Sequence, residues 1–348
     1  MKNYKKKHFT YTLATEPQLT LQEPGSQVLA KCLYCYQPLN SSNANFHQTC
    51  NKKFFGQLQT PLLAYNNEQL SALADKIIHS QMAVTGVQAK VSLSINRNDE
   101  KSTVKKLTIV GLYGDYILKP PSEYYAHLPE VEDLTMHLAE VCGLKTVPHS
   151  LVYLQDGTLC YLTKRVDRTK KGKLHMEDMC QLTERQTEDK YKGSHEQVAK
   201  TLLKYSANPL FDVTNFYELV VFSFLTGNAD MHLKNFSLLE NTEGDYTLAP
   251  AYDLVATALV NKADKEELAL TLNGKKNKLN YNDFLTAFET SGLSKKVLDN
   301  TLENFFYCKK EMEAMVKQSF LTKEYQQNFL TLLNKRYQQL NIKPSNYN

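Results

Sequence analysis

The order of two hydrophobic periodicities along the chain is the feature that most constrains its fold. Between residues 87 and 163 the patterns are mainly those of strands, and within residues 87–95 apolar and polar residues alternate, which is typical of a half-buried strand. The strand patterns cover 87–95, 107–119 (interrupted near Gly111 and Gly114) and two arms, 151–154 and 159–163, of a hairpin that turns at Asp156-Gly157. One helical pattern, 131–141, lies between them and is followed by Gly143 and Pro148.

After Asp167 the patterns become helical. Helices are expected near 177–184, 195–205, 213–226, 281–290, 295–318 and 322–340, with one small hairpin formed by 236–239 and 246–248. Strands that precede helices, instead of alternating with them, are typical of α+β proteins and not of a doubly wound parallel sheet. The 348 residues allow about two domains, so we expect a strand-rich lobe followed by a helix-rich lobe.

Composition and charge exclude several classes of protein. The content of 22% charged and 42% hydrophobic residues excludes wholesale disorder, and a net charge of +4 does not by itself indicate nucleic-acid binding. No apolar run approaches the roughly 20 residues of a membrane helix, and no apolar segment follows the basic start, so neither membrane association nor secretion is expected. The odd number of cysteines, seven, argues against a disulfide framework, and we expect a cytoplasmic protein.

The segment 227–235 carries the most informative spacing, because it places Asp230 and Asn235 in a D-x4-N pattern. In protein kinases this pattern puts a carboxylate beside the attacking hydroxyl and an amide oxygen on a metal ion. The hairpin that follows returns the chain to its starting end, where Asp253 should supply a second oxygen ligand for Mg²⁺. A plain helix C-cap and turn would look similar. His232 could orient Asp230 or be an ordinary buried side chain.

Two upstream features are compatible with phosphate binding. The segment 85–90 opens a strand with Gly86, which permits close backbone approach to a phosphate, although it matches neither common glycine-rich motif. Lys119 closes a strand and could point at nucleotide phosphates, with Glu132 of the following helix as its partner. Each feature also has a simpler interpretation, a turn glycine and an exposed lysine at a strand end.

Together these segments resemble the HipA-like serine/threonine kinases, the toxin components of bacterial toxin–antitoxin modules. The matching segments follow the order of that family and cover most of residues 82–255. They are TGVQAKVSL at 85–93, YILKP at 116–120, EDLTMHLAEVCGL at 132–144, YLTKRVDR at 161–168, MEDMCQ at 176–181, GNADMHLKNFSLL at 227–239 and LAPAYDLV at 248–255. The resemblance implies a bilobal protein-kinase-like fold, with an N-terminal extension over 1–80, an N-lobe over 81–167 and a helical C-lobe over 168–348.

The resemblance also implies roles for residues of this chain. Asp230 matches the catalytic base, Asn235 and Asp253 the Mg²⁺ ligands, Lys119 the phosphate-binding lysine, and His232 a histidine of the catalytic loop. The loop that covers the phosphates of ATP would comprise Thr85, Gly86, Val87, Gln88 and Lys90. The hinge between the lobes would comprise Lys164, Arg165 and Val166, whose backbone reads adenine, followed by Asp167 near the ribose.

Regulation and partners are implied in the same way. Many relatives autophosphorylate serines of the phosphate-covering loop, where this chain has Ala83 and Thr85, so Thr85 is the expected acceptor. The expected substrate is a translation component such as an aminoacyl-tRNA synthetase, whose phosphorylation would inhibit growth. The expected partners are a HipB-like helix-turn-helix antitoxin, through which any DNA contact would run, and a separate small protein that supplies the N-terminal subdomain for which 1–80 is too short.

The extension contains a pattern of metal ligands, Cys32-x2-Cys35 followed by His47-x2-Cys50. Two pairs of soft ligands can complete a tetrahedron around Zn²⁺, with no position left open for catalysis. We therefore expect a structural zinc knuckle over 32–50; the alternative is a coincidence of thiols beside a core histidine. Three further cysteines lie in apolar patterns and are expected to be buried, namely Cys142, Cys160 and Cys180.

Two other functions fit parts of this pattern. In one, the kinase-like body is a non-catalytic scaffold, and the knuckle and the basic tail bind a protein partner or DNA. In the other, the chain is a small-molecule phosphotransferase that uses the same metal ligands. The joint presence of Asp230, Asn235 and Asp253 favours an ATP-dependent serine/threonine protein kinase.

Overall fold

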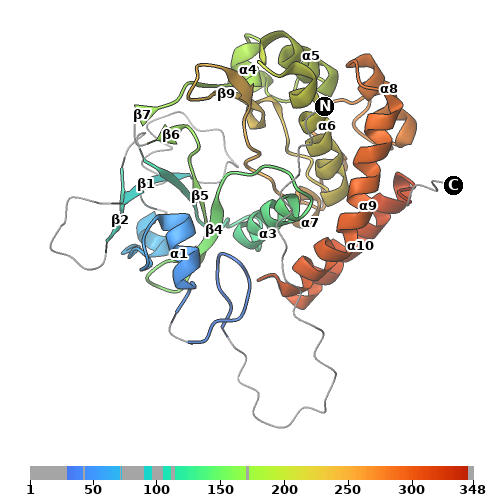
Figure 1. Cartoon of the computed structure of the whole chain (residues 1–348). Helices are drawn as coiled ribbons and strands as arrows, with labels where there is room; N and C mark the ends of the chain where they lie inside the picture. The colour runs from blue at the N-terminus through green and yellow to red at the C-terminus, as the bar shows by residue number, and fades with distance from the viewer. Residues whose placement is uncertain are drawn as a thin grey trace, which may run out of the picture.

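The first lobe is built on a five-stranded antiparallel sheet with the order β2-β1-β3-β5-β4 (Figure 1). The computed structural model describes residues 30–41, 44–70, 72, 90–95, 105–110, 114–169 and 172–343. Within these ranges the strands are β1 (Val91–Ile95), β2 (Leu107–Ile109), β3 (Tyr116–Lys119), β4 (His149–Tyr153) and β5 (Leu159–Lys164). Helix α3 (Leu128–Val141) lies against β4 and β5. These elements confirm the predicted strands and the predicted turn at Gly157.

The N-terminal extension shares the hydrophobic core of this lobe. It contains a turn-rich segment, residues 30–41, and the helix α1 (Gln48–Phe55). Phe54 and Phe55 of α1 pack their rings against Tyr116 of β3. Other buried side chains of this core come from both parts, among them Cys32, Leu33 and Leu39 from the extension and Val91, Leu93, Leu118 and Leu162 from the sheet. The extension therefore completes one face of the sheet.

The second lobe is helical and surrounds α6 (Pro209–Thr226), in which three of the four phenylalanines, Phe216, Phe222 and Phe224, are fully buried. The other helices are α4 (Met179–Leu182), α5 (His195–Tyr205), α7 (Thr257–Val260), α8 (Tyr281–Thr290), α9 (Lys295–Gln318) and α10 (Lys323–Gln339), with short 3-10 turns at η1 (Thr187–Asp189) and η2 (Leu233–Asn235). The predicted helices over 195–205, 281–290 and 295–318 begin and end at the predicted residues. The structure confirms an α+β fold with a strand-rich lobe before a helical one.

A three-stranded sheet, in the order β10-β9-β8, packs against the helical lobe, because β10 contacts α6 and β8 contacts α4. The predicted hairpin forms β9 (Ser237–Glu240) and β10 (Tyr246–Leu248), and β8 (Met176–Asp178) pairs with β9. The helix predicted near 177–184 is therefore shorter than expected. Its first residues extend along β9, and Asp178 caps α4 by accepting a hydrogen bond from Gln181 N. Two strands of two residues each, β6 (Arg168–Thr169) and β7 (Gly172–Lys173), pair with each other and were not predicted.

In the described part of the chain, no helix is both long and apolar enough to cross a membrane. The strand pattern predicted to start at residue 87 is described only from Lys90 onward.

His195, the first residue of α5, is a buried histidine that should make the folded protein less stable in acid. Its side chain is 1% exposed and packs against Phe216 and Phe236, and burial lowers its pKa to about 3. Unfolded histidine binds a proton below about pH 6.5, so each pH unit below that value should cost about 1.4 kcal/mol of folding free energy down to about pH 3. His195→Phe should remove this component.

Urea unfolding of both proteins at pH 7.5 and pH 5 measures the effect. His175→Gln, at a half-exposed histidine, is the control and should keep the acid sensitivity of the parent chain. If His195→Phe loses as much free energy on acidification as the parent, the buried imidazole is not its source.

Candidate active site

A buried group of charges joins the two lobes. Nζ of Lys119, at the end of β3, lies 2.5 Å from Oε1 of Glu132 on α3 and also binds Oδ1 of Asp253, which follows β10. Lys119 is 3% exposed and Glu132 is fully buried. The sequence leaves open whether Lys119 is paired with Glu132 or exposed at the end of a strand. The structure shows that it is buried and paired. Lys90, at 3.0 Å, is a second cation on Asp253.

These groups shift one another's protonation. Burial raises the pKa of Glu132 to about 7, although Lys119 pulls it down. Burial would also raise the pKa of Asp253, but the ammonium groups of Lys119 and Lys90 outweigh it and hold that pKa well below its usual range. Burial opposes the charge of Lys119, yet Asp253 and Glu132 together raise its pKa above its ordinary value. Lys119 is thus a permanent cation.

The loop after α6 places Asp230 and Asn235. Gly227 ends the helix with φ +71, and a Cβ there would lie 2.7 Å from Leu332, so only glycine fits. The backbone of Asp230 is held twice, because its N–H donates to Asn228 Oδ1 at 3.1 Å and its carbonyl accepts from the His232 N–H at 2.8 Å. Asn235 Nδ2 donates to the same carbonyl at 3.0 Å, which fixes the amide so that its oxygen could bind a metal ion.

The hairpin brings the second acid to this loop, as the sequence predicts. The hydroxyl of Tyr252 donates to the carbonyl of Lys234 at 3.0 Å and contacts Ser237 Oγ at 2.6 Å. The residues just before Asn235 and Asp253 are therefore in direct contact. Asp253 itself adopts a left-handed backbone conformation, with φ 59, which aspartate tolerates better than most residues. A carboxylate and an amide oxygen at one end of a hairpin form a donor set that suits Mg²⁺.

Tyr191 is a site residue that the sequence did not reveal. Its hydroxyl donates to Oδ1 of Asp230 at 2.5 Å. Tyr191 lies in an irregular segment that is joined to the catalytic loop by a bond from Leu233 N–H to the Lys190 carbonyl. This segment has no hydrophobic period, so no sequence signal could have identified the contact. The carboxylate of Asp230 therefore accepts a hydrogen bond from a hydroxyl group of the chain itself.

His232 is a buried side chain beside Tyr191. Its ring is 6% exposed and lies edge-on to Tyr191 at a centroid distance of 5.0 Å. Within the described ranges, Nδ1 makes no hydrogen bond, and burial lowers the pKa of the ring. The residue supports Asp230 through its backbone N–H and not through an imidazole bond to the carboxylate.

The predicted hinge is already partly bonded within the protein. The N–H of Lys164 donates to Pro148 and that of Arg165 donates to Asp115, both at 2.8 Å. The Arg165 guanidinium binds Asp167 in a two-point contact at 2.9 and 2.7 Å, and Asp167 is 6% exposed. The carboxylate predicted to approach ribose thus has an arginine partner. Four residues of the predicted phosphate-covering loop lie outside the described residues: Thr85, Gly86, Val87 and Gln88.

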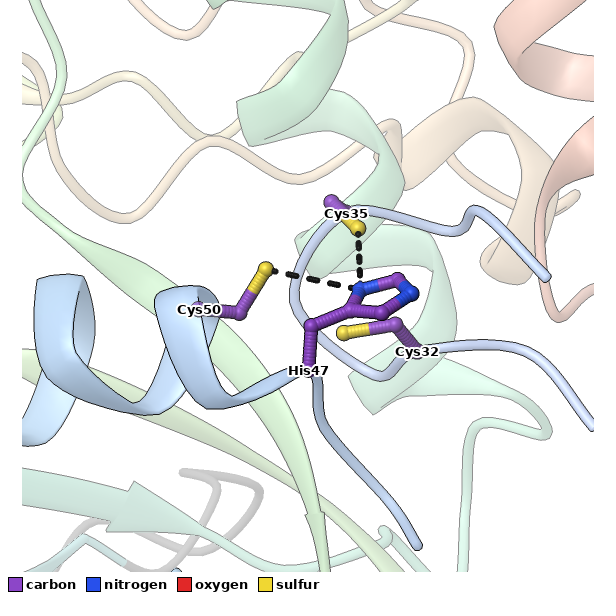
Figure 2. A group of neighbouring side chains, drawn as sticks. All are labelled: Cys32, Cys35, His47 and Cys50. Atoms are coloured by element: carbon purple, nitrogen blue, oxygen red, sulfur yellow. Dashed lines mark hydrogen bonds between the residues drawn. The ribbon is translucent and has the colours of Figure 1, made fainter. Parts of the chain in front are cut away.

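The four predicted zinc ligands converge at one point (Figure 2). His47 Nδ1 lies 3.4 Å from Cys35 Sγ and 3.7 Å from Cys50 Sγ. The ligand atoms of all four side chains lie within 4.8 Å of one another. Sulfur and nitrogen ligands on a tetrahedral zinc ion, with bonds of about 2.3 and 2.0 Å, lie about 3.5 Å apart. The measured separations bracket this value.

The surroundings of the cluster also fit zinc. His47 Nε2 lies 3.0 Å from the Pro38 carbonyl, which orients Nδ1 toward the sulfurs, as outer partners of zinc-bound histidines do.

The other cysteines predicted to be buried are buried, at 4% exposure for Cys142, 0% for Cys160 and 2% for Cys180. The seventh cysteine, Cys308 of α9, received no prediction and lies beside Cys142.

Comparison with known proteins identifies relatives of this chain. The family model described as the HipA-like C-terminal domain matches residues 82–317. The predicted kinase Y4dM of Sinorhizobium fredii is 34% identical over 189 residues, which are 51% of this chain and 45% of Y4dM. A predicted kinase of Haemophilus influenzae is 27% identical over 291 residues, which are 75% of this chain and 82% of that protein.

HipA of Shewanella oneidensis, named a serine/threonine-protein kinase toxin, is similar in sequence and in structure. It is 27% identical over 217 residues, which are 56% of this chain and 47% of HipA. A solved complex of HipA, HipB and operator DNA from this organism contains a chain with a TM-score of 0.62 at 21% identity, covering 74% of this chain and 64% of that one. The chain thus spans about half the length of two of these curated relatives.

Because Lys119 is buried in an ion pair and Lys90 is not, we expect the same substitution to lower the free energy of unfolding much more at Lys119 than at Lys90. Lys119→Met removes the cation that lowers the pKa of Glu132, so the buried carboxyl must bind a proton or stay charged without a partner on that side, and the free energy of unfolding should fall by about 3–5 kcal/mol. Adding Glu132→Gln should restore part of the loss. Lys90→Met is the control: this side chain is 47% exposed, and its pair with Asp253 should be worth at most about 1 kcal/mol. Urea unfolding of the parent chain and the three variants measures these differences, and equal losses for the two lysines would contradict the assignment.

Proposed function

Because the chain belongs to the HipA-like C-terminal domain family, we propose that it is an ATP- and Mg²⁺-dependent serine/threonine protein kinase. The observation that carries the proposal is the buried Lys119–Glu132 pair beside Asp253. A buried ion pair contributes little to stability compared with apolar residues of the same volume, so its presence calls for another purpose. In kinases, a strand lysine held by a helix glutamate binds nucleotide phosphates.

The chemistry is assigned to three polar side chains around this pair. The carboxylate of Asp230 accepts the proton of the substrate serine or threonine hydroxyl. The substrate hydroxyl takes the position on Oδ1 that the Tyr191 hydroxyl holds at 2.5 Å. Asn235 Oδ1 and Asp253 hold Mg²⁺, which neutralises charge on the transferred phosphoryl group. Lys119, kept charged by its neighbours, binds the phosphates of ATP.

The adenine and the phosphate-covering loop complete the proposed site. The N–H groups of Lys164 and Arg165 are engaged by Pro148 and Asp115, so we assign the adenine contact to the backbone of Val166. Arg165 orients Asp167 near the ribose position. Thr85 is the proposed site of autophosphorylation.

A structural zinc ion on Cys32, Cys35, His47 and Cys50 is part of the proposal. The donor set of three thiolates and one imidazole is closed, and the separations of its atoms fit a tetrahedral ion. Bound zinc would fix the turn that carries Cys32 and the first turn of α1, and these segments pack on the sheet.

The proposed partners follow the relatives. The HipA complex of Shewanella contains HipB and operator DNA, and we propose a HipB-like helix-turn-helix antitoxin for this chain, with DNA reached through it. The proposed substrate is a translation component such as an aminoacyl-tRNA synthetase, and a separate small protein is proposed to supply the N-terminal subdomain.

Removing the proposed base tests the kinase function. With labelled ATP and Mg²⁺, the parent chain should label itself or a protein of a lysate, and Asp230→Asn should lower the rate by about 10²–10⁴-fold. Asp245→Asn, at an exposed residue of the β9–β10 turn, should leave the rate unchanged. A parent chain that binds ATP without labelling any protein would favour the scaffold, and label found only in a small molecule would favour the phosphotransferase.

Removing one thiol tests the knuckle. Cys35→Ser should cost one zinc ion per chain and lower the melting temperature, because the metal holds the extension on the sheet. Elemental analysis of the purified chain gives the zinc content. Cys308→Ser, which changes a cysteine outside the cluster, should keep the zinc, and a folded Cys35→Ser chain with unchanged zinc would refute the site.

A further inference from the structure

A second group of potential metal ligands lies on α3, outside both sites described above. Asp133, His137 and Glu140 are spaced by four and three residues, so the helix presents them on one face. His149 of β4 approaches this face, and its ring centroid lies 4.5 Å from that of His137. Asp133 and His149 are at most 1% exposed and His137 is 5% exposed. Imidazole and carboxylate are the ligand types that zinc and similar ions select.

The carboxylate of Asp133 lies behind both imidazole rings and orients them. Its Oδ1 binds His149 Nδ1 at 2.8 Å. Its Oδ2 accepts a hydrogen bond from the hydroxyl of Tyr36 at 2.6 Å and lies 3.6 Å from His137 Nε2. A carboxylate on the far nitrogen of a histidine is the usual outer partner of a metal-bound imidazole, because it fixes the tautomer and the ring direction. The other nitrogens, His149 Nε2 and His137 Nδ1, therefore face away from Asp133.

Those two nitrogens meet the carboxylate of Glu140. His149 Nε2 lies 3.6 Å from Glu140 Oε1, and His137 Nδ1 lies 3.7 Å from Glu140 Oε2. Both separations are too long for hydrogen bonds, and in the described part of the chain neither nitrogen has a hydrogen-bond partner. Nitrogen and oxygen ligands on a tetrahedral ion with bonds of about 2.0 Å lie about 3.3 Å apart, close to the measured separations. A buried imidazole nitrogen usually makes a hydrogen bond, and a metal ion between these nitrogens and Glu140 would bind both of them.

We propose that His137, Glu140 and His149 bind a divalent transition metal ion, with Zn²⁺ as the expected occupant. Thr146 Oγ1 donates to Glu140 Oε1 at 2.9 Å and orients this ligand, while Asp133 orients the histidines. A cavity of about 190 Å³ is lined by His137 and Glu140 and, across it, by Cys35 and Cys50. The cavity provides an entry path and room for a water molecule as the fourth ligand. The site is distinct from the cysteine cluster, which already supplies four ligands of its own.

The proposed ion would connect three parts of the first lobe. Its ligands come from α3 and β4, and their outer partner Asp133 is bound by Tyr36 of the extension. Glu132, the neighbour of Asp133, pairs with Lys119 in the active site. An ion at this position would therefore restrain the helix that holds the phosphate-binding lysine.

Metal counting on the purified full-length chain tests the proposal. After dialysis against zinc and removal of loosely bound metal, the parent chain should retain two zinc ions. Glu140→Gln should retain one, as should His137→Gln, and Cys35→Ser should retain the other one. Glu130→Gln is the matched control, because Glu130 is on the same helix and contacts His127 instead of the cluster. Glu140 is partly exposed, so its variant should fold even where His137→Gln does not.

Cobalt substitution identifies which site each ion occupies. Co²⁺ at the cysteine cluster should show intense sulfur-to-metal absorption in the near ultraviolet, and Co²⁺ at the α3 site should add visible bands without it. Glu140→Gln should remove only the latter bands. A parent chain that keeps one ion, loses it completely in Cys35→Ser and binds no further Co²⁺ would show that the group is only a buried network of charges. None of these measurements uses ATP, so their outcome is independent of the proposed kinase activity.

Discussion

The placement of one buried ammonium group, Lys119 Nζ, determines how the two lobes meet. A charge that is removed from water must be paired, and the two carboxylates that pair it come from different lobes, Glu132 from α3 and Asp253 from the segment after β10. The backbone adds to this junction, because the Ala251 N–H donates to the Lys145 carbonyl at 2.8 Å and the Val147 N–H donates to Ala251 at 2.9 Å. The active site is thus built at the contact that joins the lobes.

Helix α3 transmits this constraint to the rest of the first lobe. Glu132 points to the active site, whereas its neighbour Asp133 binds His149 of β4 and Tyr36 of the extension. Adjacent residues of a helix are about 100° apart around its axis, so one helix can serve two sites at once. The extension is therefore linked to the candidate site through α3, and also through β3, where Phe54 and Phe55 pack on Tyr116. This explains why a segment with its own ligand cluster packs into the sheet and does not form a separate unit.

The sequence predicts those parts of the site that depend on local spacing. Asp230, Asn235 and the hairpin that returns Asp253 follow from short-range patterns, because a hairpin's register determines which residues meet at its end. The contact of Tyr191 with Asp230 joins an irregular segment to the catalytic loop, and no periodicity encodes it. The pairing of Lys119 with Glu132 was only one of two interpretations, because it depends on how far α3 lies from β3, and tertiary packing sets that distance.

The two lysines that pair with Asp253 differ in burial. In the proposed kinase, this difference determines which of the two pairs is given up when ATP and metal bind. Lys90 is 47% exposed, so its pair with Asp253 is weak and can be exchanged for a phosphate at little cost. If Asp253 binds the proposed metal ion, Lys119 would keep the fully buried Glu132 as its partner. Without Glu132, binding of Mg²⁺ at Asp253 would leave the buried ammonium without a carboxylate. Glu132 would therefore permit Asp253 to exchange Lys119 for the proposed metal ion while the position of Lys119 stays constant.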